Sequence, residues 1–151
     1  AINVGQKAFY DIPMTGYLRG LQNCALPFRR ELVLDVLNTR DDAKLLEQAR
    51  RLIKVEADAV LTSEFHAMQL LSKFYDLNVP VPDRISVMSI DSSFLSQGAA
   101  PALSAVDFSN TIQAQEMYEH LIELIQTGKT SNKILSPKLV LRRTTKNKYE
   151  I

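Results

Sequence analysis

The sequence is poor in the residues that build disulfide scaffolds and metal clusters. Its 151 residues contain one cysteine, two histidines and no tryptophan, and the formal net charge is +1. Cys24 alone can form neither an internal disulfide framework nor a thiol metal cluster, which fits a protein of the reducing cytoplasm. The near-neutral charge gives no general attraction to nucleic acid or to an anionic membrane. No apolar run approaches the length of a membrane span.

The loop signatures of common enzymes are missing as well. The sequence contains no Gly-x-Gly-x-x-Gly or Gly-x-x-x-x-Gly-Lys-Ser/Thr loop, so nucleotide phosphates lack their usual cradle. It also contains no Gly-x-Ser-x-Gly turn for a nucleophile. His120 follows Glu116 at a helical spacing, but a metal site needs further ligands, and neither His120 nor His66 has them nearby in the sequence. We therefore expect no enzyme activity, no metal and no cofactor.

The clearest structural pattern in the sequence lies at residues 57–92. A short apolar run at 57–61 ends at the polar residues 62–64, and a second apolar run at 85–90 ends at Asp91. Between them, regularly spaced apolar residues indicate a helix, which an asparagine and two prolines stop: Phe65, Met68, Leu71, Phe74, Asn78, Pro80 and Pro82. A strand, a helix and a strand of this length almost always form two parallel strands with a right-handed crossover. Because ligands of open α/β sheets bind outside the carboxyl ends of the strands, the two polar strand ends mark a candidate site.

The rest of the chain continues this alternation. In chain order the pattern predicts a strand at 1–5, a polar loop at 6–13, a helix from Thr15 to Pro27, a strand at 32–37, a helix after Thr39, the unit just described, a loop at 92–101, an extended piece at 103–106, a long helix at 109–128 and a last strand at 134–141. Pro137 interrupts the last strand and predicts that it lies at a sheet edge. The sum is half of a doubly wound α/β architecture.

Single residues carry further expectations. Gly20 lies inside the first predicted helix, where glycine costs about 1 kcal/mol, and this indicates a close contact between helix and sheet. Cys24 is expected to be a small buried residue. Thr39 is expected to cap the second helix, whose buried stripe is expected at Leu45, Ala49, Leu52 and Ile53. Gly128 suits the C-terminal end of the long helix. We expect the polar stretch 142–151 to be mobile. Because the chain starts at Ala1 without an initiator methionine, we expect it to be a piece of something longer.

Three separate segments resemble one family. They are Val79-Pro-Val-Pro-Asp-Arg-Ile-Ser-Val-Met-Ser-Ile-Asp91, Pro101-Ala-Leu-Ser-Ala-Val106 and Ile134-Leu-Ser-Pro-Lys-Leu-Val-Leu-Arg-Arg-Thr144. In order and spacing they are similar to the effector-binding domain of lactose/galactose-repressor-type transcription regulators, and the resemblance covers nearly the whole chain. It implies the fold that periplasmic sugar-binding proteins also use. In that fold, two similar Rossmann-like, three-layer α/β lobes with parallel sheets hold a small molecule between them.

By this resemblance the chain is an incomplete two-lobe domain. The resemblance implies a C-terminal lobe at 1–108, a long helix of the other lobe with its turn at 109–133, a returning edge strand at 134–145 and a mobile tail at 146–151. It also implies that the first lobe and an N-terminal DNA-binding head lie outside this chain. A homodimer is implied through helix and loop surfaces, here the helix at 64–77 and the loop at 92–100.

The sequence departs from the family's pattern at three places. Ser63 and Glu64 stand where an Asn-Asp pair is usual. Tyr17 stands where an arginine usually clamps sugar hydroxyls. Asp91 and Ser92 stand where two aspartates are usual, so one aspartate survives. The resemblance therefore predicts the fold but not the identity of the ligand.

Five residues are candidates for contact with a ligand. Asp91 can accept hydrogen bonds as a charged acceptor, with a cap or turn role in the following loop as the alternative. Ser63 can donate to a ligand hydroxyl, although a plain helix N-cap is the favoured alternative, and Glu64 suits the first turn of a helix in any case. Tyr17 can stack on a ligand or simply pack, and Phe108 can form an aromatic platform or a core residue. Behind these rank the residues of the first predicted loop, Phe9, Tyr10 and Asp11.

The sequence thus favours a ligand-sensing module of a cytoplasmic bacterial transcription regulator. A small, sugar-like effector would bind between two lobes and favour one arrangement of them by differential affinity. DNA would be bound by the absent head and not by this chain. The alternative is a solute-binding protein of a transport system with the same fold. A small α/β enzyme is a third hypothesis, which lacks a nucleophile–base pair and a cofactor loop.

Overall fold

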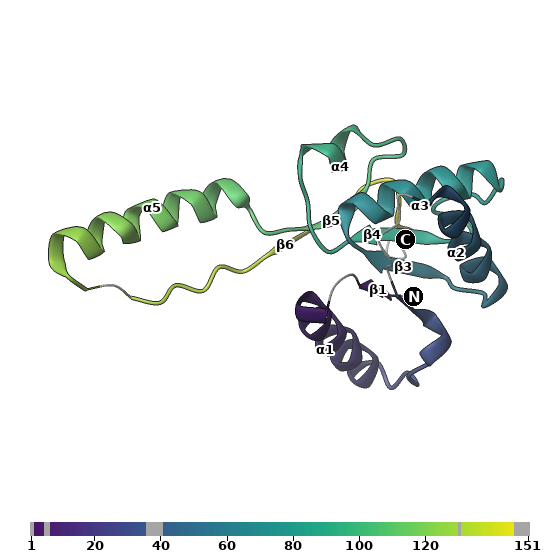
Figure 1. Ribbon diagram of the computed structural model, residues 1–151, viewed down its shortest axis with the longest axis horizontal. Helices are drawn as coiled ribbons and strands as arrows, with labels where there is room; N and C mark the ends of the chain where they lie inside the picture. Colours follow the sequence, from purple (N-terminus) through teal and green to yellow (C-terminus); the bar gives the residue numbers. More distant parts are fainter. Residues whose placement is uncertain (1, 5–6, 36–40, 130, 147–151) are drawn as a thin grey trace, which may run out of the picture.

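The chain is organised around one six-stranded sheet, seen in the computed structural model of Figure 1. The structure describes residues 2–4, 7–35, 41–129 and 131–146. The strands are β1 (Ile2–Val4), β2 (Val33–Asp35), β3 (Ala59–Thr62), β4 (Ser86–Ser89), β5 (Ser104–Asp107) and β6 (Lys138–Val140). Their order is β2-β1-β3-β4-β5-β6; the first five are parallel, and β6 runs antiparallel to β5. The predicted α/β fold with a parallel sheet is confirmed.

Helices cover both faces of this sheet and make a three-layer arrangement (Figure 1). The α-helices are α1 (Lys7–Asn23), α2 (Asp42–Lys54), α3 (Glu64–Asp76), α4 (Phe94–Gly98) and α5 (Asn110–Thr127), with a short 3-10 helix at Arg30–Leu32. α1 lies on one face, and α2 and α3 lie together on the other. The loop predicted at 92–101 contains the short helix α4.

The main core lies between the sheet and the α2–α3 layer. α2 buries Leu45, Ala49 and Leu52 at helical spacing, as the sequence predicts. The helix predicted from the spacing of Phe65, Met68, Leu71 and Phe74 is confirmed as α3, which buries the apolar residues Ala67, Leu70, Leu71 and Phe74. Phe65 is 66% exposed, and Met68 is only partly buried.

The first helix differs most from the prediction. α1 begins at Lys7, so the predicted polar loop at 6–13 is helical from that residue on, and Pro13 lies inside the helix. The stretch from Gln6 to Pro13 was predicted as a polar loop, and this prediction is wrong from Lys7 on. Gly20 faces open space within this chain, so the predicted close contact with the sheet is wrong. Cys24 is exposed rather than buried, because the helix ends at Asn23 and Cys24 enters the following turn.

A different residue caps α2 from the one predicted. Asp41 accepts hydrogen bonds from the backbone N–H groups of Ala43 and Lys44. A carboxylate at this position satisfies amides that the helix itself leaves unpaired. Thr39, the predicted cap, lies outside the described residues.

The C-terminal segment returns to the sheet. β6 is an edge strand that begins directly after Pro137, shorter than predicted but on the predicted edge. The stretch from residue 142, expected to be mobile, is anchored as far as residue 145. Thr144 is fully buried and its hydroxyl accepts from the Ser104 N–H at 2.8 Å, while its carbonyl accepts from the Val87 N–H at 2.7 Å. Bridging β4 and β5 in this way requires a fixed backbone, so the expectation was wrong there.

The long helix α5 stands away from the sheet (Figure 1). It ends at Gly128, whose φ of 66° is the left-handed C-cap conformation that the sequence predicts. None of its residues is buried. Its apolar side chains are exposed at Ile112, Met117, Tyr118, Leu121, Leu124 and Ile125.

Candidate functional site

The carboxyl ends of β3 and β4 lie side by side. The two strands are parallel and pair in register, with Thr62 opposite Ser89. The residues that follow each strand therefore meet at one edge of the sheet, as the sequence predicts. This edge brings together three of the five candidate residues: Ser63, Glu64 and Asp91.

Asp91 bridges the two strand ends. Its Oδ1 accepts the backbone N–H of Glu64 at 2.7 Å and the Ser89 hydroxyl at 2.9 Å. The Ser89 hydroxyl also contacts the Asp91 backbone, donating to its carbonyl and accepting from its N–H at 3.1 Å. A carboxylate at this position satisfies an amide in the first turn of α3 and complements the helix dipole. Asp91 thus acts as a cap, although for α3 rather than for its own loop, and it stays exposed to solvent.

The Ser63 hydroxyl does not form the hydrogen bond that would cap α3. It holds the N-cap position of α3 with an extended backbone, yet its side chain makes no capping hydrogen bond. The capping role favoured for Ser63 is therefore taken by Asp91 from the neighbouring strand end. This leaves the Ser63 hydroxyl available at the edge for another partner, and a ligand contact there stays a prediction.

The Glu64 carboxylate ties the loop after β4 to α3 through hydrogen bonds to Ser93 and Ser96, and this set of hydrogen bonds is called the clamp. It is only 8% exposed, and both carboxylate oxygens accept hydrogen bonds from that loop. The Ser93 N–H and hydroxyl donate at 2.8 and 2.6 Å. The Ser96 N–H donates at 3.0 Å, and the Ser96 hydroxyl donates as well. Burial by itself raises the pKa of Glu64, but the hydrogen bonds outweigh it and hold the pKa below its usual value.

The clamp was not predicted from the sequence. The first-turn position of Glu64 on α3 was predicted correctly, but it gives no information on where the side chain reaches. The only available signal was the serine-rich composition of residues 92–96. Because both Glu64 oxygens are engaged within the protein, a ligand would have to compete with Ser93 and Ser96 for this carboxylate.

The two aromatic candidates lie on other elements. Tyr17 of α1 packs in a small apolar cluster with Met14, Val33 and Leu61, which fits the packing alternative. Burial raises the pKa of Tyr17, and the nearby Arg29 guanidinium partly offsets this. Phe108 follows β5 and is 43% exposed, on the connection to α5. A ligand role for either ring stays a prediction.

The lower-ranked candidates lie on a helix. Phe9, Tyr10 and Asp11 belong to the N-terminal part of α1 rather than to a loop after β1, and their side chains lie outside the described part of the structure.

Within the described residues, no group of three or more His, Cys, Asp and Glu side chains is arranged to hold a metal ion. None of the described helices is long and apolar enough to cross a membrane.

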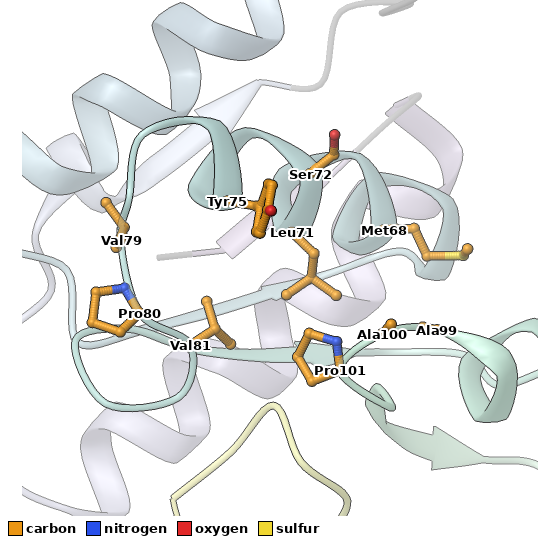
Figure 2. A pocket seen from close by; sticks show the side chains of 10 residues that line it. All are labelled: Met68, Leu71, Ser72, Tyr75, Val79, Pro80, Val81, Ala99, Ala100 and Pro101. Carbon is orange, nitrogen blue, oxygen red and sulfur yellow. The ribbon is translucent and has the colours of Figure 1, made fainter.

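An apolar groove lies beside α3. It has a volume of about 520 Å³ and is lined by α3 and two loops: Met68, Leu71, Ser72, Tyr75, Val79, Pro80, Val81, Ala99, Ala100 and Pro101. Figure 2 shows Leu71 pointing from α3 toward Val81 and Pro101. Tyr75 of α3 also lines the groove and is 84% exposed. The groove is therefore lined in part by both segments that the family resemblance implies for a homodimer, 64–77 and 92–100.

Comparison with known families decides what kind of domain this is. Residues 4–145 match the model of the periplasmic binding protein-like domain. The chain belongs to this family. The match includes Val4 of β1, the candidate edge and every described element from α1 to the anchored C-terminal segment.

Relatives within this domain family are transcription regulators. The chain is 23% identical over 136 residues to the HTH-type transcriptional repressor PurR of Vibrio parahaemolyticus, covering 88% of this chain and 41% of that protein. It is 26% identical over 141 residues to the arabinose metabolism transcriptional repressor of Geobacillus stearothermophilus, covering 88% and 39%. The chain thus spans well under half the length of these relatives.

The solved structures agree on the fold. The Escherichia coli transcriptional repressor ascG superposes with a TM-score of 0.83 at 24% identity, covering 95% of this chain and 54% of that one. These findings confirm the predicted resemblance to the effector-binding domain of lactose/galactose-repressor-type regulators. Both of these relatives are repressors, so the comparisons give less support to a transport protein than to a regulator.

Proposed function

We propose that this chain is the ligand-sensing part of a bacterial transcription regulator. It supplies one of two lobes, and a small sugar-like effector binds between them at the β3–β4 edge. The observation that carries the proposal is the match of residues 4–145 to a ligand-binding domain family whose similar relatives are repressors. The edge supports it with an exposed carboxylate at Asp91 and an uncommitted hydroxyl at Ser63.

DNA binding belongs to a different part of the whole protein. A separate head contacts the operator in the cytoplasm, and the effector controls it by binding one lobe arrangement more tightly than the other. No bond of the effector is made or broken. This assignment follows the repressor relatives and the near-neutral charge of the chain, +1, which gives no electrostatic footprint for DNA.

The exposed face of α5 supports a second lobe. Met117 and Ile125 are 73% and 71% exposed in this chain, and burying each large apolar side chain contributes about 1.5–3 kcal/mol. A helix with a wide apolar face and no buried residue needs a partner surface. In the proposed whole protein, α5 packs on the lobe that precedes this chain.

The groove beside α3 supports a homodimer. Its lining is mostly aliphatic, and the exposed Tyr75 ring supplies the kind of amphipathic anchor that is enriched at protein interfaces. A second copy of the chain would place its own α3 and its loop 92–100 on the same surface. The proposed regulator is therefore a dimer that joins two effector sites.

A thermal-shift screen of the whole protein tests the sensor function. The panel consists of monosaccharides, sugar phosphates, nucleosides and amino acids, and a ligand that binds only the native state raises the melting temperature by mass action. Two variants locate the site. Asp91→Ala removes both the cap of α3 and the ligand acceptor, whereas Asp91→Asn retains an oxygen for the Glu64 N–H.

The outcomes of this screen separate three cases. A compound that shifts the wild type and loses its effect in both Asp91 variants supports the sensor and its site. A compound that acts equally on all three proteins supports a sensor with its site elsewhere. A folded protein that responds to none of the four classes contradicts the proposal.

A further inference from the structure

The short helix α4 depends on Glu64 for its position. It has five residues, Phe94–Gly98, and a helix of that length is not stable on its own in water. Glu64 Oε1 accepts the Ser93 N–H at 2.8 Å and the Ser96 N–H at 3.0 Å, so a residue of α3 satisfies backbone donors at the start of α4. The Ser93 hydroxyl connects the two helices again, because it donates to Glu64 Oε2 at 2.6 Å and accepts from the Leu95 N–H at 3.1 Å.

The clamp also decides which face of α4 points outward. Ser93 and Ser96 are three residues apart and therefore lie on one side of a helical turn, toward α3. Ser96 is fully buried there, and its carbonyl accepts from the Leu103 N–H at 2.9 Å, next to β5. Phe94 and Leu95 lie on the outer side of the turn and are 80% and 45% exposed. The hydrogen bonds of the clamp thus set the direction of two apolar side chains.

The clamp joins two elements that each expose an aromatic ring. Phe65 of α3 directly follows Glu64 and is 66% exposed, and Phe94 of α4 directly follows Ser93. Because Glu64 and Ser93 are hydrogen-bonded, these two rings start from neighbouring backbone positions. From α4 the chain continues to residues 99–101, which line the groove across from α3 (Figure 2). The clamp therefore supports both the exposed rings and the loop wall of the groove.

A second copy of the chain fits this surface. None of the described residues that line the groove carries a charge, so the groove favours an apolar partner over a charged one. The same chain supplies exposed rings that complement such a hollow: Phe65, Tyr75 and Phe94. A two-fold interface brings one surface against its own copy, so each protomer offers rings to its partner's groove.

We propose that Glu64 is a positioning residue of the homodimer interface. Its carboxylate holds α4 against α3, so the loop wall of the groove and the outer face of α4 are ordered before a second copy binds. The inference rests on the proposed function, since it describes how the proposed dimer is built. Without the clamp, this loop has to be ordered during association. Fixing the backbone of even one residue costs about as much free energy as a tenfold change in Kd.

Sedimentation velocity of the whole protein over a range of concentrations measures the Kd of the dimer. In Glu64→Ala, which removes every acceptor of the clamp, we expect this Kd to rise at least about tenfold. Glu64→Gln keeps one oxygen for the Ser96 N–H, so its Kd should lie between those of the wild type and Glu64→Ala. Phe94→Ser, at an exposed ring, should weaken the dimer without lowering the melting temperature.

A matched core variant separates positioning from a general loss of stability. Leu52→Ala truncates a fully buried side chain of α2, a helix that contributes no described residue to the groove. Because it leaves a cavity in the core, we expect it to lower the melting temperature by an amount comparable with Glu64→Ala. The Kd of the dimer should nevertheless stay at the wild-type value.

Each result supports or overturns the inference. A weaker dimer in Glu64→Ala and in Phe94→Ser, with the Leu52→Ala dimer intact, supports it. A wild-type Kd in Glu64→Ala or in Phe94→Ser, or an equal weakening in Leu52→Ala, overturns it while the dimer itself stands. If Glu64→Ala does not fold, an unchanged Kd in Glu64→Gln overturns the inference and a raised Kd supports it. If the wild type is a monomer at every concentration, the proposed dimer fails and the inference falls with it.

Discussion

Removal of the Glu64 carboxylate is the sharpest test of how this lobe is held together. In Glu64→Ala, four donors lose their acceptor: the N–H and hydroxyl groups of Ser93 and Ser96. Ser96 is fully buried, so water cannot replace the lost partner there, whereas Ser93 is only partly buried and can be resolvated. The destabilisation should therefore come mainly from Ser96.

The magnitude follows from the cost of a buried unpaired donor. Such a donor costs about 1–3 kcal/mol, and two of them on Ser96 give about 3 kcal/mol once partial relaxation is allowed for. For a domain of this size, each kcal/mol lowers the melting temperature by about 2–4 °C, so we expect a loss of about 6–12 °C. Glu47→Ala, at an exposed position of α2, should change the stability by less than about 0.5 kcal/mol.

Urea unfolding of the whole protein, followed by circular dichroism, measures this difference, and hydrogen exchange localises it to the amides of Ser93 and Ser96. The pH dependence gives a second readout. Because the pKa of Glu64 is lowered by folding, its stabilisation is present at neutral pH and is lost as the pH falls through that lowered pKa. If Glu64→Ala is no less stable than Glu47→Ala and shows unchanged exchange at 93 and 96, the clamp does not hold the loop.

Three further predictions concern the core, acid sensitivity and the groove. Phe74→Ala, at a fully buried ring, should cost about 3–5 kcal/mol in urea unfolding, and a loss below 1 kcal/mol would mean that α3 does not seat this ring in the core. Burial lowers the pKa of His66, so the unfolded chain takes up its proton first and stability should fall as the pH drops below about 6.5; His66→Gln should show a flatter dependence from pH 7 to 5, and identical curves would contradict this. In the proposed dimer, Tyr75→Asp should shift the whole protein toward monomers in sedimentation velocity, while an unchanged dimer would place the interface elsewhere.

Much of the layered fold could be predicted because strong periodicity determines element type. The β3–α3–β4 unit, the buried face of α2, the Gly128 cap and the edge position of β6 all follow from local patterns. The errors lie where local rules conflict. The predicted polar loop ending at Pro13 is helical from Lys7 on, and Gly20 faces open space where the prediction required a close contact. Side-chain burial within α3 also depends on its neighbours rather than on spacing alone.

For the candidate site, the position of the residues could be predicted from the sequence, but their hydrogen-bond partners could not. The rule for strand ends correctly brought Ser63, Glu64 and Asp91 to one edge. Which oxygen meets which donor depends on contacts between residues 27 to 32 positions apart, and no sequence pattern specifies them. The sequence therefore assigned the cap to Ser63, whereas the structure assigns it to Asp91.

The role of Asp91 as the cap of α3 bears on Ser63 and Glu64, which stand where the family usually has an Asn-Asp pair. A carboxylate at Asp91 is fixed in place by the Glu64 N–H and by the Ser89 hydroxyl, so it needs no neighbouring ligand-binding side chain to orient it. Glu64, by reaching into the loop, engages both of its carboxylate oxygens within the protein. In the proposed site, one fixed carboxylate and one uncommitted hydroxyl then remain for a ligand. Such a site depends on few protein contacts from this lobe, so in the proposed two-lobe protein the lobe preceding this chain must supply most of the remaining specificity.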